Sequence, residues 1–493
     1  MDQPGGAPKL RRELNIWEAI GISLALMAPS MAANINPQGT ASVIGRAVPL
    51  AFILATIGVL LVAYGFVRLT QQLHHAGSVY GFVGVTLGPR AGVFSGLALL
   101  GTYAFYAIVT AMAAGRFGAD FLRALGVFGS VDAAPHLAEY VVGFIALGLA
   151  FAFALAPVRN GTRILLIVEG VTVALILVTV LIIVMKLLGG SAPAGQTFTL
   201  DVFSLPSGID LSTVALGAVF GFLSFAGFEA AATLGEEAKN PTRDIPRAIL
   251  GVAIFGGIYF VVVTAVEVMG FGTSDSAVAS FVASGSLLGD LGRQYIAAWV
   301  GDVITVGAAI SAFGCCLACL VGASRLLFAV SRDNTETRGF AYMAKISPKY
   351  GTPSGALTVV TAASAIIIVA WAVFFNAAAF DVFLGAGTIG TLIILVAYLM
   401  LTIGAIKFLF FSGRSLVARW EMVIPIAAIL VLGYTIFRNV WPLPDSSQPA
   451  FWYVVVTVFW LVVSIIFVYA LPGLARRVGE RLERDEGLLA AKG

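Results

Sequence analysis

The stretch GISLALMAPSMAANINPQG, residues 21–39, lies inside a long apolar segment near the N-terminus. It carries Pro29 near its middle and a polar run that ends in Pro37. Proline lacks the amide donor that a helix needs and clashes with the preceding turn, so a regular helix is interrupted here. A helix that crosses a bilayer needs about 20 mainly apolar residues, and this segment is long enough. The stretch therefore predicts a membrane helix that is broken near its middle.

A second stretch of this kind, ALGAVFGFLSFAGFEAAATLGEEAKNP, covers residues 215–241. Gly217, Gly221 and Gly227 weaken its helix, and Glu229 lies in apolar surroundings. Unwound backbone in a membrane is tolerated where it lines a cavity, and the ends of half-helices then bind a carboxylate or an ammonium group. The two breaks predict a binding site for a small zwitterion. The alternative is that both are tolerated kinks in packed helices.

The composition sets the class of protein. Of the 493 residues, 59% are hydrophobic and 11% are charged, against about 25% charged residues in a soluble domain. This excludes a disordered chain and a soluble globular protein. Apolar runs longer than the roughly ten-residue alternating strands of outer-membrane barrels exclude a barrel as well. What remains is an all-α polytopic membrane protein.

Twelve apolar segments are predicted to cross the membrane. They cover residues 15–43, 48–70, 91–118, 137–157, 162–188, 212–235, 246–271, 295–330, 354–375, 379–404, 420–440 and 451–470.

The positive residues predict the orientation of these spans. With the N-terminus inside, 23 of the 29 lysines and arginines fall on the inner side. Because positive residues accumulate on the cytoplasmic side, both termini are predicted to be cytoplasmic, with tails at 1–14 and 471–493. The polar start of the chain has no short apolar region with a cleavage site, so we expect no cleaved signal peptide. The expected location is the plasma (inner) membrane.

Several classes of chemistry lack their motifs. Cys315, Cys316 and Cys319 lie in one apolar run with no distant cysteine, which argues against a disulfide, and Cys316 and Cys319 have no second pair of metal ligands. Phosphate-binding and zinc-protease motifs are missing. We therefore expect no enzyme, no cofactor, no metal and no nucleic-acid partner.

Three stretches resemble the amino acid–polyamine–organocation permease family. FAGFEAAATLGEEAKNPTRDIPRAI (225–249) closely resembles the family's signature around its sixth helix. GSVYGFVGVTLGPRAGVFSG (77–96) is similar to the loop between the second and third helices, and ASRLLFAVSRD (323–333) to the end of the eighth. The resemblance extends from Leu14 to about Ala470.

The resemblance implies a fold with two inverted repeats of five spans each. The first repeat would occupy residues 15–188 and the second residues 205–411, with helices one and six broken. Two peripheral spans would follow in residues 418–470.

The resemblance also implies where a substrate binds. The family's first break usually reads Gly-Ser/Ala-Gly, and counting back from Pro37 places Ser30-Met31-Ala32 there, so a flexible Met31 side chain lies beside the site. Backbone groups are expected to bind the two ends of an amino acid. These groups are the N–H groups of Met31, Ala32 and Ala33 for the carboxylate, and the carbonyls near Ala28 and Phe225 for the amine.

Side chains around the breaks are further candidates for substrate contact. Phe222 and Phe225 are candidates to close over a substrate, with packing inside the bundle as the alternative. Ala226 and Gly227 lie at the second break itself. Tyr103 on span three and Thr388 on span ten are weaker candidates for the pocket wall.

Three residues are candidates for coupling transport to an ion. Glu229 is a carboxylate inside a membrane span, where a charge costs free energy, so it marks a functional site by default. The alternative is a structural glutamate that ties two helices together. Glu169 on span five stands where some family members carry a lysine, so it would attract sodium or carry a proton; the alternative is an acid near the cytoplasmic end. Ser311 on span eight is a possible sodium ligand, but the residues after it are poor in oxygen, which favours protons.

These observations predict a secondary active transporter that moves an amino acid or a related amine by alternating access. Proton symport is the first choice. An amino acid or amine exchanger and a sodium-coupled symporter are the alternatives, and a channel or a transport-like receptor is the alternative from a different class. The expected partners are the substrate, protons or sodium, and the lipid bilayer. The sequence does not decide the oligomeric state.

Overall fold

The computed structural model describes residues 15–73, 79–127, 136–156, 161–234, 238–332, 338–412 and 416–470, with residues 473, 475–477 and 480. The predicted tail at 1–14 and most of the predicted tail at 471–493 lie outside the described residues. The regular elements of the described chain are helices. The α-helices are α1 (Ile16–Met27), α2 (Pro29–Ile44), α3 (Val48–Gln72), α4 (Val79–Leu87), α5 (Pro89–Ala124), α6 (Leu137–Leu155), α7 (Gly161–Leu188), α8 (Leu211–Phe225), α9 (Pro241–Phe271), α10 (Asp275–Ala283), α11 (Leu287–Tyr295), α12 (Ala298–Ser331), α13 (Arg338–Met343), α14 (Ser354–Phe375), α15 (Ala379–Phe411), α16 (Val423–Val440) and α17 (Pro449–Ala470). Short 3-10 helices are η1 (Gly45–Ala47), η2 (Asp201–Phe203), η3 (Ala230–Leu234) and η4 (Arg419–Met422).

Eleven helical segments of the described chain are long and apolar enough to cross a membrane. The first, Ile16–Gln72, has 57 residues and covers the predicted spans 15–43 and 48–70. At 1.5 Å per residue it is ~86 Å long, far more than the ~30 Å hydrocarbon core that one crossing needs. The predicted class, an all-α polytopic membrane protein, is confirmed. The count of twelve spans and the inverted repeat stay predictions.

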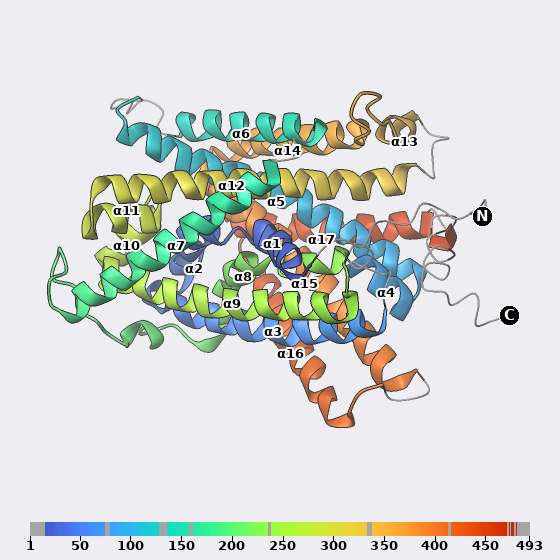
Figure 1. The fold of residues 1–493 in the computed structure, drawn as a ribbon, viewed down its shortest axis with the longest axis horizontal. Coiled ribbons are helices and arrows are strands. Elements are labelled where there is room, and N and C mark those ends of the chain that lie inside the picture. The colour runs from blue at the N-terminus through green and yellow to red at the C-terminus, as the bar shows by residue number, and fades with distance from the viewer. Residues whose placement is uncertain are drawn as a thin grey trace.

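The long helices run roughly along one axis of the molecule (Figure 1). The short helices α10 and α11 lie at one end of the bundle, and α4 and α13 lie at the other. The predicted orientation makes the end with α10 and α11 external, and we call it the external end. Helix α5 is buried along most of its length, between α12 on one side and α15 on the other. The core of the bundle is therefore built around α5.

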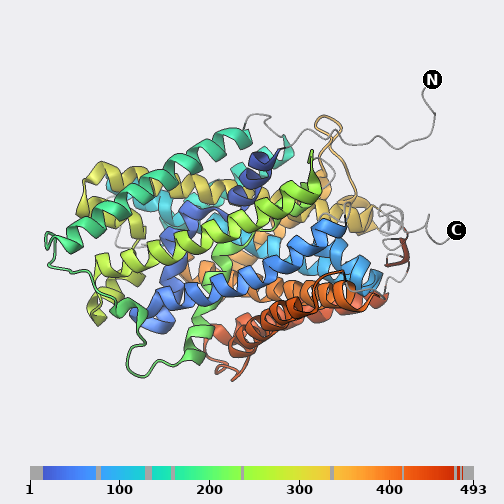
Figure 2. The ribbon, with the colours of Figure 1, turned by 60° about the horizontal axis from the view of Figure 1, so that its bottom comes forward.

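Peripheral helices present their apolar side chains to the outside. Helices α16 and α17 pack on α15 along one flank of the bundle (Figure 2). Large apolar residues such as Leu430 on α16 and Phe459 on α17 are exposed there. Lipid tails are as apolar as these side chains, so such a surface suits a bilayer.

Helices α4, α10 and α11 were not predicted from the sequence. Each has only nine residues, too few to cross a bilayer, and the search for spans therefore passed over them. Helices α10 and α11 precede α12, the predicted eighth span, and turn the connection from α9 into a folded external segment. We call residues 275–295, with α10 and α11, the external segment.

Candidate substrate site at two helix breaks

The first break lies at Ala28, between α1 and α2. Ala28 adopts a left-handed conformation, with φ 46° and ψ 59°, which few residues other than glycine adopt. Pro29 starts α2, where its missing amide is no loss because the first amides of a helix have no partner within it. The break therefore comes two residues before the predicted Ser30-Met31-Ala32. Pro37 lies inside α2 and does not end it.

The second break follows α8, which ends at Phe225. Gly227 has φ +101°, a conformation that glycine adopts without steric cost. The chain then continues through Glu229 into the short helix η3. Both breaks predicted from the sequence are therefore present.

The two breaks face each other. A Cβ atom built on Gly227 would lie 2.7 Å from Cβ of Leu26, the residue two positions before Ala28. On one side of the breaks, the Ala231 N–H of η3 donates to the Ser23 hydroxyl of α1 at 3.0 Å. On the other side, Asn36 of α2 donates to the Ser224 hydroxyl of α8 at 2.8 Å. The halves of the two broken helices are thus tied together in pairs, which brings the predicted site together.

The N-terminus of α2 is capped by side chains from two other helices. The Ser30 N–H donates to Oε1 of Glu169 on α7 at 2.8 Å. The Met31 N–H donates to the Ser311 hydroxyl of α12 at 3.3 Å. The Ala32 N–H donates to the Ala28 carbonyl at 2.9 Å. A carboxylate at a helix N-terminus satisfies free amides and interacts well with the helix dipole.

This capping bears directly on the predicted coupling residues. Glu169 is 7% exposed and lies at the first break. Glu169 and Ser311 meet on adjacent amides of α2, and their role in coupling to sodium or protons stays a prediction. The amides assigned by resemblance to a substrate carboxylate, those of Met31, Ala32 and Ala33, stay a prediction, and Met31 and Ala32 already have partners within the protein.

Glu229 is buried at the second break, among aromatic residues. It lies within electrostatic range of Tyr103 and Tyr106 of α5 and of Tyr398 of α15. Within the described chain, its Oε2 atom has no hydrogen-bond partner, and neither has the Tyr398 hydroxyl. A buried carboxyl oxygen without a partner is costly. Glu229 is therefore able to receive a proton or an ammonium group.

The aromatic residues at the second break pack against neighbouring helices. The Phe225 ring lies 5.4 Å from that of Phe260 on α9. Phe222 points to α3, since a Cβ on Gly58 would lie 2.5 Å from the Phe222 ring. Packing, the alternative reading of these rings, therefore describes both in this conformation.

The remaining candidates for the pocket wall have different surroundings. Tyr103 is half-buried and lies beside Gly322 of α12. Thr388 donates to the Leu384 carbonyl of its own helix at 2.9 Å. Ala226 is half-buried at the second break.

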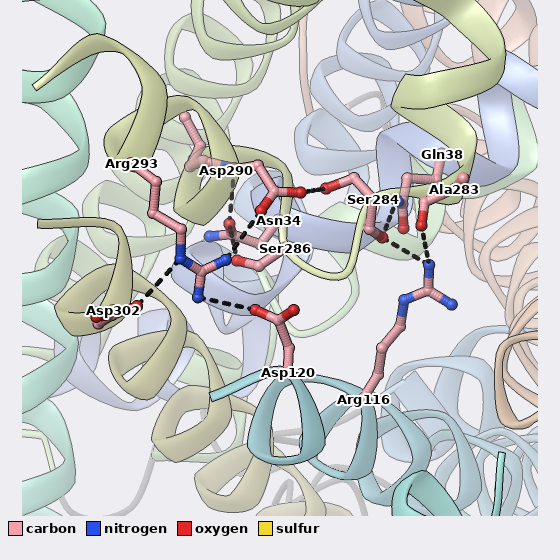
Figure 3. Close-up of polar contacts among 11 residues, drawn as sticks. Asn34, Gln38, Arg116, Asp120, Ala283, Ser284, Ser286, Asp290, Arg293 and Asp302 are labelled. Atoms are coloured by element: carbon pink, nitrogen blue, oxygen red, sulfur yellow. Dashed lines mark hydrogen bonds and ion pairs between the residues drawn. The ribbon is translucent and has the colours of Figure 1, made fainter. Parts of the chain in front are cut away.

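The external segment is tied to the first broken helix through Asn34 (Figure 3). The Asn34 amide donates to the Ser30 carbonyl at 2.8 Å. Its Oδ1 accepts from the Ser286 hydroxyl and from the Leu288 N–H, both at 2.9 Å. One buried side chain therefore connects the break to the N-terminus of α11.

Arg293 of α11 holds the external segment to two long helices. Its guanidinium donates to Asp120 of α5 at 2.9 Å, to Asp302 of α12 at 3.0 Å and to Asp290 of α11 at 2.9 Å (Figure 3). Burial lowers the pKa of Arg293, but these carboxylates outweigh that effect and raise its pKa above the ordinary value. Arg293 therefore stays charged and keeps all three partners.

Two further side chains hold the loop between α10 and α11. Gln38 of α2 donates to the carbonyls of Phe281 and Ser284 at 3.0 and 2.7 Å. Arg116 of α5 donates to the Ser284 carbonyl at 2.6 Å (Figure 3). Its guanidinium also lies 4.3 Å from the ring centre of Phe380. These contacts close the bundle over the external ends of α2 and α5.

This closure was not predicted from the sequence, although Asn34 lies in the interrupted stretch 21–39. One usable signal was present: a run of buried leucines, Leu287, Leu288 and Leu291, surrounds an Asp290–Arg293 pair in a short amphipathic helix.

Comparison with known proteins agrees with this architecture. The family model described as "Amino acid permease" matches residues 14–463. The branched-chain amino acid permease BcaP of Bacillus subtilis is 26% identical over 351 residues, which are 71% of this chain and 72% of the relative. The low-affinity putrescine importer PlaP of Escherichia coli (strain K12) is 25% identical over 355 residues, 70% of this chain and 72% of the relative. BcaP of Lactococcus lactis is 26% identical over 390 residues, 77% of this chain and 78% of the relative.

The matched residues include both helix breaks, the external segment and nearly all the spans. A transporter of amino acids or amines, and not an enzyme, agrees with these relatives and with the many apolar helices. The chain is a multi-pass membrane protein and belongs to the amino acid permease family.

Proposed function

We propose that the protein is a secondary active transporter that moves an amino acid or a related amine by alternating access, with proton symport as its mode. The observation that carries this proposal is the meeting of two helix breaks, with a buried acid beside each. Glu169 caps the α2 amide of Ser30, and Glu229 lies at the other break with one oxygen unpaired. Buried acids that change their protonation with their surroundings are suited to couple a proton to a conformational change.

The closed external segment supplies the other half of the proposed cycle. In this conformation Asn34 and Arg293 hold α10 and α11 against the bundle. Opening of this segment would give the two breaks access to the external side. Closing of the segment would keep a bound substrate from returning to that side. The halves α1 and η3, tied through Ser23, are the elements that would move at the cytoplasmic side.

The capping of α2 favours a second candidate within the same class. An α-amino acid would have to displace Glu169 or Ser311 from the first amides of α2 before its carboxylate could bind them. An amine without a carboxylate would leave both caps in place and bind as a cation near Glu229. The first candidate matches the relatives named for branched-chain amino acids, and the second matches the relative named for putrescine.

The test is uptake into proteoliposomes that contain the purified full-length chain. Labelled leucine and labelled putrescine are offered in turn under an inward proton gradient, under an inward sodium gradient, and with unlabelled substrate inside. Accumulation driven by the proton gradient is the expected result, and the compound that accumulates identifies the substrate class. Accumulation that needs internal substrate would identify an exchanger, and accumulation that needs sodium would identify a sodium symporter.

Two results would overturn the proposal. Flux far above the turnover of a carrier, measured as current across a planar bilayer, would indicate a channel. Binding of leucine or putrescine without any flux under all three conditions would indicate a receptor.

A further inference from the structure

Glu267 on α9 has a buried carboxyl group that has no role in the transport cycle proposed above. It lies four residues before the end of α9 and is 0% exposed. Neither of its carboxyl oxygens has a hydrogen-bond partner in the described part of the chain. An ionised carboxylate without a partner is far too costly to hold in an apolar interior, whereas the protonated form is tolerated. In this conformation Glu267 therefore holds a proton.

Glu267 lies on the face of α9 that packs into the bundle. Residues three to four and seven positions apart share a helix face, so Val263 and Phe260 lie below Glu267 on this face. Phe260 packs its ring on that of Phe225 at 5.4 Å, and Val263 is fully buried. The carboxyl is thus directed towards the packed interior and away from lipid.

No charged group of the helices around α9 forms a pair with Glu267. These helices are α1, α2, α3, α7, α10, α11, η2 and η3, with α8 in ring contact. Their titratable groups are engaged elsewhere, exposed, or at the other end of the bundle. Among the described residues they are Glu18 at the start of α1, Tyr64 and Arg68 with Glu421, Glu169 with Ser30, Lys186 with the Tyr295 carbonyl, Asp290 with Arg293, Tyr295 with the Gly270 carbonyl, and the exposed Arg163, Asp201 and Asp275.

On α9 itself, Tyr259 is the ionisable group nearest to Glu267 along the inner part of the helix. It lies within electrostatic range of both Glu267 and Glu169, and its hydroxyl donates to the Pro29 carbonyl at 3.4 Å. Eight residues separate Tyr259 from Glu267, ~12 Å along the helix axis. Glu267 therefore forms a site separate from the caps at the first break.

The external segment docks within one turn of Glu267. The Tyr295 hydroxyl of α11 donates to the Gly270 carbonyl at 3.0 Å. Leu291 of α11 packs on the same glycine, since a Cβ on Gly270 would lie 2.9 Å from its Cδ2 atom. Glu267 is fully buried and α11 packs on the turn of α9 that follows it, so we expect water to reach its carboxyl when α11 moves away. An ionised Glu267 needs that water, so its ionisation opposes closure of the external segment.

We propose that Glu267 is a proton-binding site whose occupation allows the external segment to close, so that each closure takes up one proton from the external side. This inference rests on the proposed alternating-access function and adds a second proton site to it. A proton needs no ligand besides the carboxyl, whereas a metal ion needs several. The described residues hold no group of three or more acidic, histidine or cysteine side chains that would supply them.

The first experiment measures hydrogen–deuterium exchange of α10 and α11 in the full-length protein, in lipid nanodiscs, from acidic to alkaline pH. The exchange rates are corrected for the intrinsic pH dependence of exchange. Opening of the wild-type segment should then increase by up to about tenfold for each unit by which the pH rises, because one proton is released on opening. In Glu267→Gln, which resembles the protonated side chain, opening should not change with pH and should stay at the level that wild type shows at acidic pH. Asp275→Asn, a change at an exposed acid of α10, should behave as wild type.

The wild-type protein alone tests the role of Glu267, even if Glu267→Gln does not fold. Opening of the wild-type segment that does not depend on pH would overturn it, and this result needs no variant. A pH response of Glu267→Gln equal to that of wild type would also overturn it.

A second experiment separates this inference from the proposed function. Counterflow of leucine or putrescine without a pH gradient should persist in Glu267→Gln within about twofold, while accumulation driven by a proton gradient is lost. Absence of counterflow in wild type would reject the transport proposal alone, since the exchange experiment would still report on Glu267. Proton-driven accumulation in Glu267→Gln equal to that of wild type would reject the role of Glu267 and leave the transport proposal intact.

Discussion

The hydrogen bond that caps the first amide of α2 predicts how the free energy of unfolding changes when Glu169 is replaced. Its Oε1 atom accepts from the Ser30 N–H at 2.8 Å in a buried position. Glu169→Ala removes this bond and leaves a buried N–H without a partner, which costs about 1–3 kcal/mol, and it also removes buried side-chain contacts. We expect the free energy of unfolding to fall by about 2 kcal/mol or more. Glu169→Gln keeps a side-chain oxygen that can accept from the Ser30 N–H, so the free energy of unfolding should fall by no more than about 1 kcal/mol.

The assay is reversible unfolding of the full-length protein by sodium dodecyl sulfate in mixed micelles. The matched control is Asp201→Asn, an exposed acid in the connection between α7 and α8, which should change stability by less than about 0.5 kcal/mol. Two results would refute the reasoning. One is Glu169→Ala with the stability of wild type, and the other is Glu169→Gln with the same loss as Glu169→Ala.

The remaining predictions concern the second break and the external segment. Gly227→Ala should destabilise the protein by at least about 1–2 kcal/mol in the same unfolding assay, because φ of Gly227 is +101° and the new Cβ would meet Leu26. The control is Gly251→Ala, which adds a Cβ in open space on α9 and should be neutral or slightly stabilising. Arg293→Lys, which cannot bind three carboxylates in one plane, should increase exchange of the α11 amides about tenfold, and unchanged exchange would remove Arg293 from the closure. Glu229→Gln should fold normally and flatten the pH dependence of uptake, and an unchanged pH profile at normal expression would exclude Glu229 from coupling.

The helix breaks were predictable because their causes are local. Pro29 cannot donate an amide, and Gly227 tolerates a positive φ, whatever surrounds them. The exact position of the first break was not predictable. A proline fits the first turn of a helix as well as it ends one, and the caps from Glu169 and Ser311 stabilise a helix that starts at Pro29.

The roles of the acids depended on contacts across the chain. Glu169 and Ser30 are 139 residues apart in sequence, and their meeting makes Glu169 a cap at the break. Arg293 and Asp120 are 173 residues apart, and neither residue alone indicates an external closure. Glu267 has no hydrogen-bond partner in the described part of the chain, and its burial depends on how α11 packs over α9.

The class of this protein follows from its amino-acid sequence, because mean hydropathy and the scarcity of charge are sums over residues that folding does not change. The sequence also determined that two spans would be interrupted, because proline and glycine act on their own backbone. The packing of the helices sets which side chains satisfy the interrupted backbone, which acids of the described chain lack partners, and which short helices close the external end. Those features come from the packing of helices far apart in sequence, and a single span carries no record of its neighbours.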